Sequence, residues 1–418
     1  MGLANLADLT GYRMTNWIAD LSLIESLPLD ILHDVLLAID SVADFSSMIR
    51  ASPTIYRHYL RSRVFWLRNC FELELGAVVF DAFAVYRSST TEFRTKRTKD
   101  SVFRFIETYR LQRRQQNTPQ SVLIDHDKII PLVAFYTKIV KRLAKQFVAW
   151  TQAHHAGLSS PAQLSTTEAR RILRAFYRYQ LFCNLFSPAP QSRRGICTNE
   201  ERLEWFLDIF EPWEIEEILC VNAFVGDKYK EVLGEVTWDF HPDNPKWDAG
   251  RTDPSTPEGA YNISWFEEFY RIGMSSLGLT VLSSIFKASD HSTLVDVVAK
   301  HIISSLDDWL FEATDERVQY RRRERSLSDR DLAQDRREEI MFEADREDLV
   351  PMAWVTIWKG TYSNLYGTHM RDSFRDWGYV MWDADRLVNS GAVDTLKYEW
   401  EDFCTRANGE IDDPRDFI

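Results

Sequence analysis

The stretch from Leu27 to Trp66 constrains the fold of this chain more than any other part of the sequence. It opens with Leu27-Pro28, and proline is favoured in the first turn of a helix because no free N–H is needed there and its φ is already helical. Beyond the proline, apolar residues recur at the spacing of one helical face. They are Ile31, Leu32, Val35, Leu36 and Ile39. The pattern predicts an amphipathic first helix.

Two more short helices are predicted within the same stretch. Val42, Phe45 and Ile49 are spaced three and four residues apart and predict the second helix. Ser52-Pro53 supplies an N-cap side chain and a proline at the first position of the third helix. Three helices this short bury too little surface to be stable alone. Part of their apolar surface must therefore contact the rest of the chain or another molecule.

The three predicted helices resemble an F-box. The shared features are a Leu-Pro opening, an acidic residue two positions after the proline, an apolar first helix, a second helix, an aromatic close, and a helix junction similar to that common in filamentous fungi. In this chain they are Leu27-Pro28, Asp30, Ile31 to Ile39, Phe45 to Ile49, Phe65-Trp66 and Ala51-Ser52-Pro53. Two later segments, 213–218 and 376–383, look like segments of uncharacterised fungal F-box-like proteins.

An F-box implies docking onto the adaptor Skp1 and, through it, onto the cullin of an SCF-type ubiquitin ligase. On this resemblance, the residues expected to bind Skp1 are Leu27, Pro28, Ile31, Leu32, Val35, Leu36, Ile39, Phe45 and Ile49. The C-terminal part would hold an unknown target protein and raise its effective concentration near the ligase, without bond chemistry of its own. A second hypothesis stays open: a non-catalytic scaffold or interaction protein whose F-box-like helices are only core packing.

The whole sequence predicts a mainly α fold, with an N-terminal three-helix F-box followed by an irregular all-α domain with long loops. We expect an F-box-like domain at 22–68, a linker and connecting helix at 69–118, and an α-helical domain at 119–418. The sequence STTE at 165–168 is a capping box that opens a helix. The segment 238–259 is rich in Pro, Asp and Gly and is expected to be irregular.

Helical spacing of apolar residues predicts the remaining helices of the large domain. They are expected at 127–154, 165–186, 199–210, 213–233, 263–271, 277–288 and 292–312. Ser101 is expected to cap a helix after a polar, basic loop at 88–100. The apolar segment 70–86 is compatible with strand or helix. The segment 315–348 interleaves both signs of charge and is compatible with a mobile loop or an exposed helix.

Bulk composition restricts the classes of partner. The net charge of −13 argues against general nucleic-acid affinity, because phosphate binding needs a basic face. The five cysteines are scattered, without metal-site or disulfide spacing, which suits a reducing compartment. No secretory signal or apolar run of membrane-spanning length is present in the sequence. We therefore expect a cytoplasmic or nuclear protein that does not enter a membrane.

No motif in the sequence supports catalysis or cofactor binding. Phosphate-binding glycine loops and a nucleophile elbow are both missing. His154-His155 lacks a metal-binding partner at helical spacing. Trp354 and Trp358 are one helical turn apart and are expected to pack in a core rather than line a pocket. We nominate no catalytic, metal or cofactor residue and expect no enzyme, although a pocket collecting ionisable residues would favour one.

Overall fold

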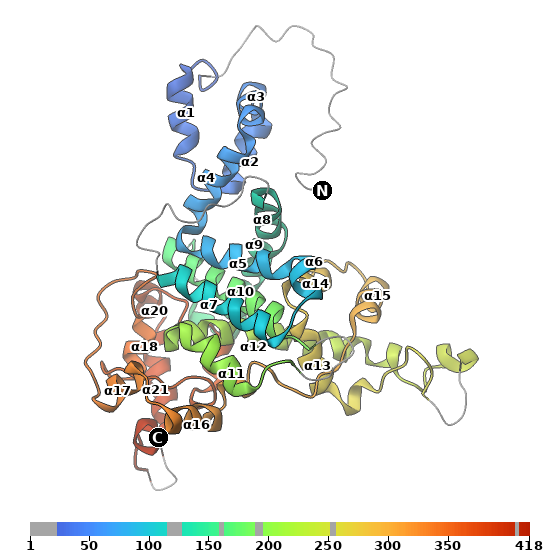
Figure 1. Cartoon of the computed structure of the whole chain (residues 1–418), viewed down its shortest axis with the longest axis vertical. Helices are drawn as coiled ribbons and strands as arrows, with labels where there is room; N and C mark the ends of the chain where they lie inside the picture. Colours follow the sequence, from blue (N-terminus) through green and yellow to red (C-terminus); the bar gives the residue numbers. More distant parts are fainter. Residues whose placement is uncertain (1–22, 115–127, 159–162, 189–194, 251–255, 406–408) are drawn as a thin grey trace.

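The structure is a computed structural model, and it describes residues 23–114, 128–158, 163–188, 195–250, 256–405 and 409–418 (Figure 1). Within these ranges, the regular secondary structure is helical. Extended pairing in the same ranges is limited to two isolated bridges, Glu339 with Thr361 and Thr405 with Ile411. The all-α prediction is confirmed for the part of the chain that is described.

The first four helices follow the predicted pattern closely. They are α1 (Leu29–Leu37), α2 (Val42–Ala51), α3 (Pro53–Arg61) and α4 (Arg63–Leu75). Ser41 caps α2 by accepting the N–H of Asp44, and Ser52 caps α3 by accepting the N–H of Ile55 at 3.2 Å. Pro53 is the first residue of α3, as the sequence predicts. These caps satisfy N–H groups that have no partner inside the helix.

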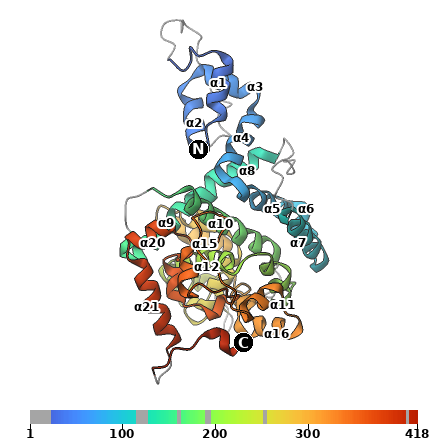
Figure 2. The same cartoon turned by 90° about the vertical axis from the view of Figure 1, so that its left-hand side faces the viewer.

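Helices α1, α2 and α3, which we call the N-terminal module, stand apart from the rest of the molecule at one end of its long axis (Figures 1 and 2). They pack on one another and on α4. Their shared core contains aliphatic and aromatic side chains from all four helices. Its buried members are Leu32, Leu36, Val42, Phe45, Ile49, Ile55, Tyr59, Trp66 and Leu67.

Helix α4 joins the N-terminal module to the remainder, which we call the body. Near its C-terminal end, the Glu74 carboxylate accepts the N–H of Val42 at 2.9 Å and pairs with Lys141 of the body at 2.5 Å. Phe71 packs edge-on against Tyr136 of the body, with ring centroids 5.8 Å apart. The domain boundary expected after residue 68 falls inside this helix, and the one expected after residue 118 lies outside the described residues.

The body is built from the helices after α4. They are α5 (Val79–Ser89), α6 (Thr91–Thr95), α7 (Lys99–Arg114), α8 (Ile129–Phe135), α9 (Lys141–His154), α10 (Thr166–Phe186), α11 (Asn199–Trp205), α12 (Pro212–Phe240), α13 (Glu267–Ser276), α14 (Leu279–Ile285), α15 (His291–His301), α16 (Glu316–Arg325), α17 (Asp329–Asp335), α18 (Met352–Ile357), α19 (Asp372–Asp376), α20 (Ala384–Asn389) and α21 (Ala392–Cys404). Helix α10 is buried along most of its length and packs against α5 and α12. Trp354 and Trp358 are buried, which confirms the core prediction for both.

The structure confirms some of the local predictions for the body and contradicts others. The predicted capping box is confirmed, because Ser165 and Glu168 exchange side-chain bonds with each other's backbone N–H at 3.0 Å. The ambiguous segment 70–86 is helical. The cap prediction at Ser101 is wrong: α7 begins at Lys99, and Ser101 instead bonds back to Thr98. The loop predicted at 88–100 contains α6.

The helix predicted at 292–312 is too long, because α15 ends at His301. Beyond that point the chain runs along α13. The N–H of Ser305 donates to the carbonyl oxygen of Phe269 at 2.9 Å, and at Gly273 a Cβ would lie only 2.2 Å from the carbonyl oxygen of Ile303. This close backbone approach accompanies the end of the helix, and beyond it Trp309 and Leu310 are buried whereas Leu306 and Phe311 are exposed.

The charged segment 315–348 forms α16 and α17, joined by a buried ion pair that no apolar pattern would reveal. Arg322 donates to Asp331 at 2.9 Å, and the Asp331 side chain is completely buried. Burial alone would raise the pKa of Asp331, but hydrogen bonds from Arg322 and Ser328 outweigh it and hold that pKa below its usual range. The segment is therefore held by charge pairing rather than by an apolar face.

The interface between α10 and α12 contains further buried ion pairs. Arg174 donates to Glu217 at 2.6 Å, and Arg178 donates to Glu214 at 2.8 Å. Arg178 also pairs with Asp81 of α5 at 3.3 Å. Each of these charges is removed from water and is tolerated only because a partner of opposite charge faces it.

Replacing Glu217 by alanine is expected to lower the free energy of unfolding by about 3 kcal/mol, because the buried Arg174 would lose its two hydrogen bonds to that carboxylate and keep only the more distant Glu214, at 3.6 Å, as an anionic partner. Chemical denaturation followed by circular dichroism measures the change. Glu92→Ala is the matched control, since Glu92 pairs with Lys96 in solvent and should leave the denaturation midpoint where it is. Equal midpoints for both variants would contradict the structural role of the buried pair.

Candidate functional site

The nine residues expected to bind a partner all lie on or under the surface of the N-terminal module. Four of them are buried in the core of the module and support its surface from below: Leu32, Leu36, Phe45 and Ile49. Three are half-buried: Leu27, Val35 and Ile39. Pro28 and Ile31 are exposed, and the Ile31 side chain is 45% accessible. The structure thus brings the nine together and divides them between a core and an outer face.

The outer face of α1 contains an apolar residue that the sequence pattern did not single out. Leu29 is 62% exposed, and it lies in the first turn of α1 directly after the proline. Phe65, at the start of α4, is also exposed and stacks on the His33 ring with centroids 6.0 Å apart. Leu29 of α1 and Phe65 of α4 thus add two exposed apolar side chains to Ile31. Leu29 lies three residues before Leu32, and this helical spacing could have identified it in the sequence as a residue of the first helix.

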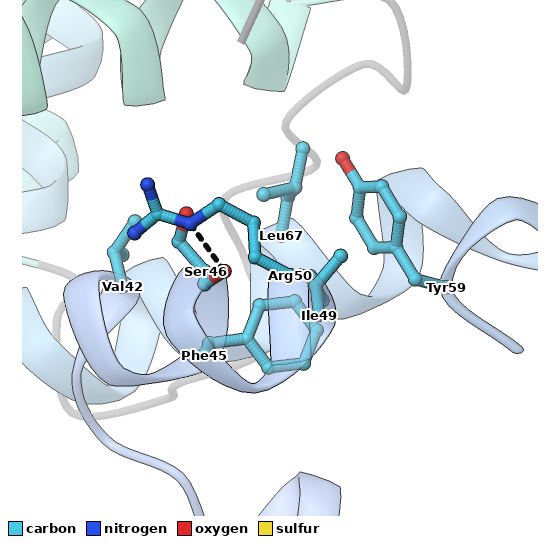
Figure 3. Close-up of a pocket in the computed structure, with 7 residues that line it drawn as sticks. All are labelled: Val42, Phe45, Ser46, Ile49, Arg50, Tyr59 and Leu67. Atoms are coloured by element: carbon cyan, nitrogen blue, oxygen red, sulfur yellow. Dashed lines mark hydrogen bonds between the residues drawn. The ribbon is translucent and has the colours of Figure 1, made fainter. Parts of the chain in front are cut away.

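A small hollow lies between α2, α3 and α4 (Figure 3). Phe45, Ile49 and Tyr59 surround it, and Arg50 crosses its edge while donating to the carbonyl oxygen of Ser46 at 3.2 Å. Its volume is about 20 Å³, which is room for one water molecule. The hollow is a packing defect of the module core and is too small to hold an organic ligand.

A much larger cleft, of about 470 Å³, opens on the body between α12, α13, α19 and the turn at 308–311. Its lining is dominated by ionisable side chains. They are Asp227, Lys230, Glu267, Glu268, Arg271, Asp308, Asp372, Arg375 and Asp376. We call it the charged cleft. Sequence reasoning missed it because its residues come from segments about 150 positions apart, and only the fold brings them together.

Two carboxyl groups of the charged cleft have raised pKa values. Burial raises the pKa of Asp308 to about 6, against the opposing charge of Arg271. Burial also raises the pKa of Asp376, and the negative charges of Asp227 and Asp372 add to the shift. A cleft with perturbed carboxyl groups is a candidate binding site on physical grounds.

The described residues contain no group of three or more His, Cys, Asp or Glu side chains placed to hold a metal ion. All five cysteines are buried. Burial raises the pKa of the Cys70 thiol to about 12 and those of Cys197 and Cys404 to about 11. These thiols stay protonated near neutral pH and are poor nucleophiles.

The chain was compared with protein-family models, curated proteins and solved structures, and none of the three comparisons found a match. No family model matches the chain. No curated protein and no solved structure matches it either. Among the described helices, none combines the length and apolar character needed to cross a bilayer.

Asp308→Asn is expected to remove a pH-dependent loss of stability. The folded state holds the Asp308 proton more tightly than the unfolded state, so the free energy of unfolding falls as pH rises from about 4 to about 6. The asparagine does not titrate, and its oxygen can still accept the N–H of Phe311. The variant should gain about 1–2 kcal/mol relative to the native chain over this interval. Denaturation curves at pH 4, 5, 6 and 7 measure the difference.

The exposed Asp385→Asn variant serves as the control for that measurement, because it removes the same charge outside the cleft. It should follow the pH dependence of the native chain. A constant offset between Asp308→Asn and the native chain from pH 4 to pH 7 would contradict the burial of a tightly held proton at Asp308.

Proposed function

We propose that the N-terminal module is an F-box that docks onto a Skp1-like adaptor, and that the chain is a substrate-receptor subunit of an SCF-type ubiquitin ligase. The observation that carries this proposal is the exposure of apolar side chains on the first helix of a module that projects from the body (Figure 2). The role is one of binding: the body holds a target protein, and the module brings it close to the ligase.

The placement of the module supports a docking role. Helix α1 packs mainly against α4, and α2 and α3 pack against each other and α4. The later helices of the body lie on the other side of α4 in both views (Figures 1 and 2). The outer face of α1 is thus left accessible to a second protein.

The composition of that face is also suited to a protein partner. Leu29 and Ile31 are exposed on α1, and Asp30 and Asp34 lie beside them on the same helix, also exposed. Residues two positions apart point about 200° apart on a helix, so Leu29 and Ile31 flank the two carboxylates, and a partner with apolar pockets on either side of a basic group would match this face. The buried residues beneath, including Leu32 and Leu36, fix the orientation of the exposed ones.

The alternative of a scaffold with F-box-like helices used only as core packing has a different expectation. It requires that the apolar residues of α1 be covered by later helices of the same chain. The exposure of Leu29 and Ile31 favours docking over that alternative. The burial of Leu32, Leu36, Phe45 and Ile49 is compatible with a docking module and with a scaffold alike.

Ile31→Glu is expected to weaken binding of a purified Skp1-like adaptor by about thirtyfold or more, which corresponds to about 2 kcal/mol for one central apolar anchor. Ile31 is exposed, so the substitution leaves the core of the module intact. Isothermal titration calorimetry with the full chain measures the affinity, and circular dichroism confirms folding.

Leu111→Glu provides the matched control, because Leu111 is a similarly exposed apolar residue on α7 of the body. It should bind the adaptor as the native chain does. The proposal fails if the native chain shows no binding, or if Ile31→Glu and Leu111→Glu have the same affinity.

A further inference from the structure

The charged cleft is lined by residues of the body, and its helices α12 and α13 lie away from the N-terminal module (Figure 1). It is lined by six carboxylates and three cationic side chains, an excess of three negative charges at neutral pH. Its volume of about 470 Å³ admits a group as large as an amino-acid side chain.

Two of the three cations in the cleft are already neutralised by the chain itself. Arg375 donates to the fully buried Glu216 at 2.9 and 3.0 Å and to Asp372 at 2.6 Å. Arg271 donates to Glu268 at 3.0 Å. These pairs leave the cleft dominated by the carboxylates of the remaining acidic residues.

Three carboxylates line the side of the cleft formed by α12 and α19: Asp227 and Asp372 are exposed, and Asp376 is half-buried. The negative charges of Asp227 and Asp372 raise the pKa of Asp376, beyond the larger effect of burial. The indole N–H of Trp150 donates to Asp227 at 2.8 Å and fixes the position of that carboxylate. A further positive charge entering the cleft would reduce the repulsion among these carboxylates, as His154 and Arg375 already do at Asp376.

Aromatic side chains stand beside the carboxylates. Phe311 lines the cleft and is partly exposed, which offers a ring face to a cation. Trp265 and Phe266 directly precede the cleft residues Glu267 and Glu268, and Trp265 is 78% exposed. Carboxylates beside an exposed aromatic ring are suited to an ammonium or guanidinium group on an apolar stem.

We propose that the charged cleft binds a lysine or arginine side chain of a basic peptide segment in a partner protein. The long side chain inserts its cationic end between Asp227, Asp308 and Asp376, and its aliphatic stem contacts Phe311. Resting on the proposed function, this segment belongs to the target protein held for ubiquitin transfer.

A peptide accounts for the site better than a free polyamine does. The exposed aromatic side chains of Trp265 and Phe266 lie outside the cleft, where only a longer ligand would cover them. The net charge of −13 also draws a basic protein segment toward the chain over a longer range than the cleft alone.

The test uses the full chain and a fluorescein-labelled seven-residue peptide, Gly-Ala-Arg-Lys-Arg-Ala-Gly, followed by fluorescence anisotropy. The double variant Asp227→Asn/Asp376→Asn keeps an oxygen for the Trp150 N–H and should weaken binding at least tenfold. The control Asp385→Asn/Asp394→Asn removes the same charge at exposed positions of α20 and α21 and should change the affinity less than twofold.

Three outcomes overturn the proposal. The first is no binding of the peptide to the native chain. The second is an equal loss in the two double variants, which would show general charge attraction. The third is displacement of the peptide by spermidine at a concentration equal to that of unlabelled peptide, which would identify a small cation as the occupant.

Adaptor binding by the cleft variant separates this inference from the proposed function. Asp227→Asn/Asp376→Asn leaves α1 unchanged and should bind a Skp1-like adaptor as the native chain does. Loss of peptide binding with adaptor binding retained supports the cleft as a separate site. Peptide binding by a chain that fails to bind the adaptor would keep the cleft and remove its role in ubiquitin transfer.

Discussion

The carboxylate of Glu74 ties the two parts of the molecule together. It accepts the backbone N–H of Val42 at the start of α2, and it pairs with Lys141 at the start of α9. The amide of Asn69, one turn earlier on α4, donates to the carbonyl oxygen of Leu37 at 3.1 Å. These contacts fix α1 and α2 to a helix that is itself packed on the body, so the module is held in a defined position while its outer face stays accessible.

Inside the body, buried arginines are paired with buried carboxylates. Arg174 and Arg178 extend from α10 toward the carboxylates of α12, and Arg322 pairs with Asp331 between α16 and α17. Such pairs contribute little net stability but are costly to break, because the partner left behind is an uncompensated buried charge. They also select one packing arrangement, since a shifted helix would separate every pair at once.

The sequence could predict the features that depend on neighbouring residues. The Ser52-Pro53 start of α3 and the capping box at Ser165 are local, and the structure contains both. The end of α15 could not be predicted, because it depends on the backbone of α13 approaching at Gly273. The charged cleft was also beyond prediction, since no spacing rule relates α12 to α19. For the charged segment 315–348 the sequence allowed either a mobile loop or an exposed helix. Apolar spacing could not decide between them, because the buried contacts of this segment are ionic.

The two proposed binding surfaces differ in character: α1 exposes Leu29 and Ile31, whereas the cleft on the body carries an excess of negative charge. Hydrogen–deuterium exchange of the full chain, with and without a Skp1-like adaptor, tests the central claim that α1 is the open docking face. The account predicts slower exchange in peptides covering residues 27–39 and unchanged exchange in α12. Unchanged exchange in residues 27–39, or slowing confined to the body, would contradict it.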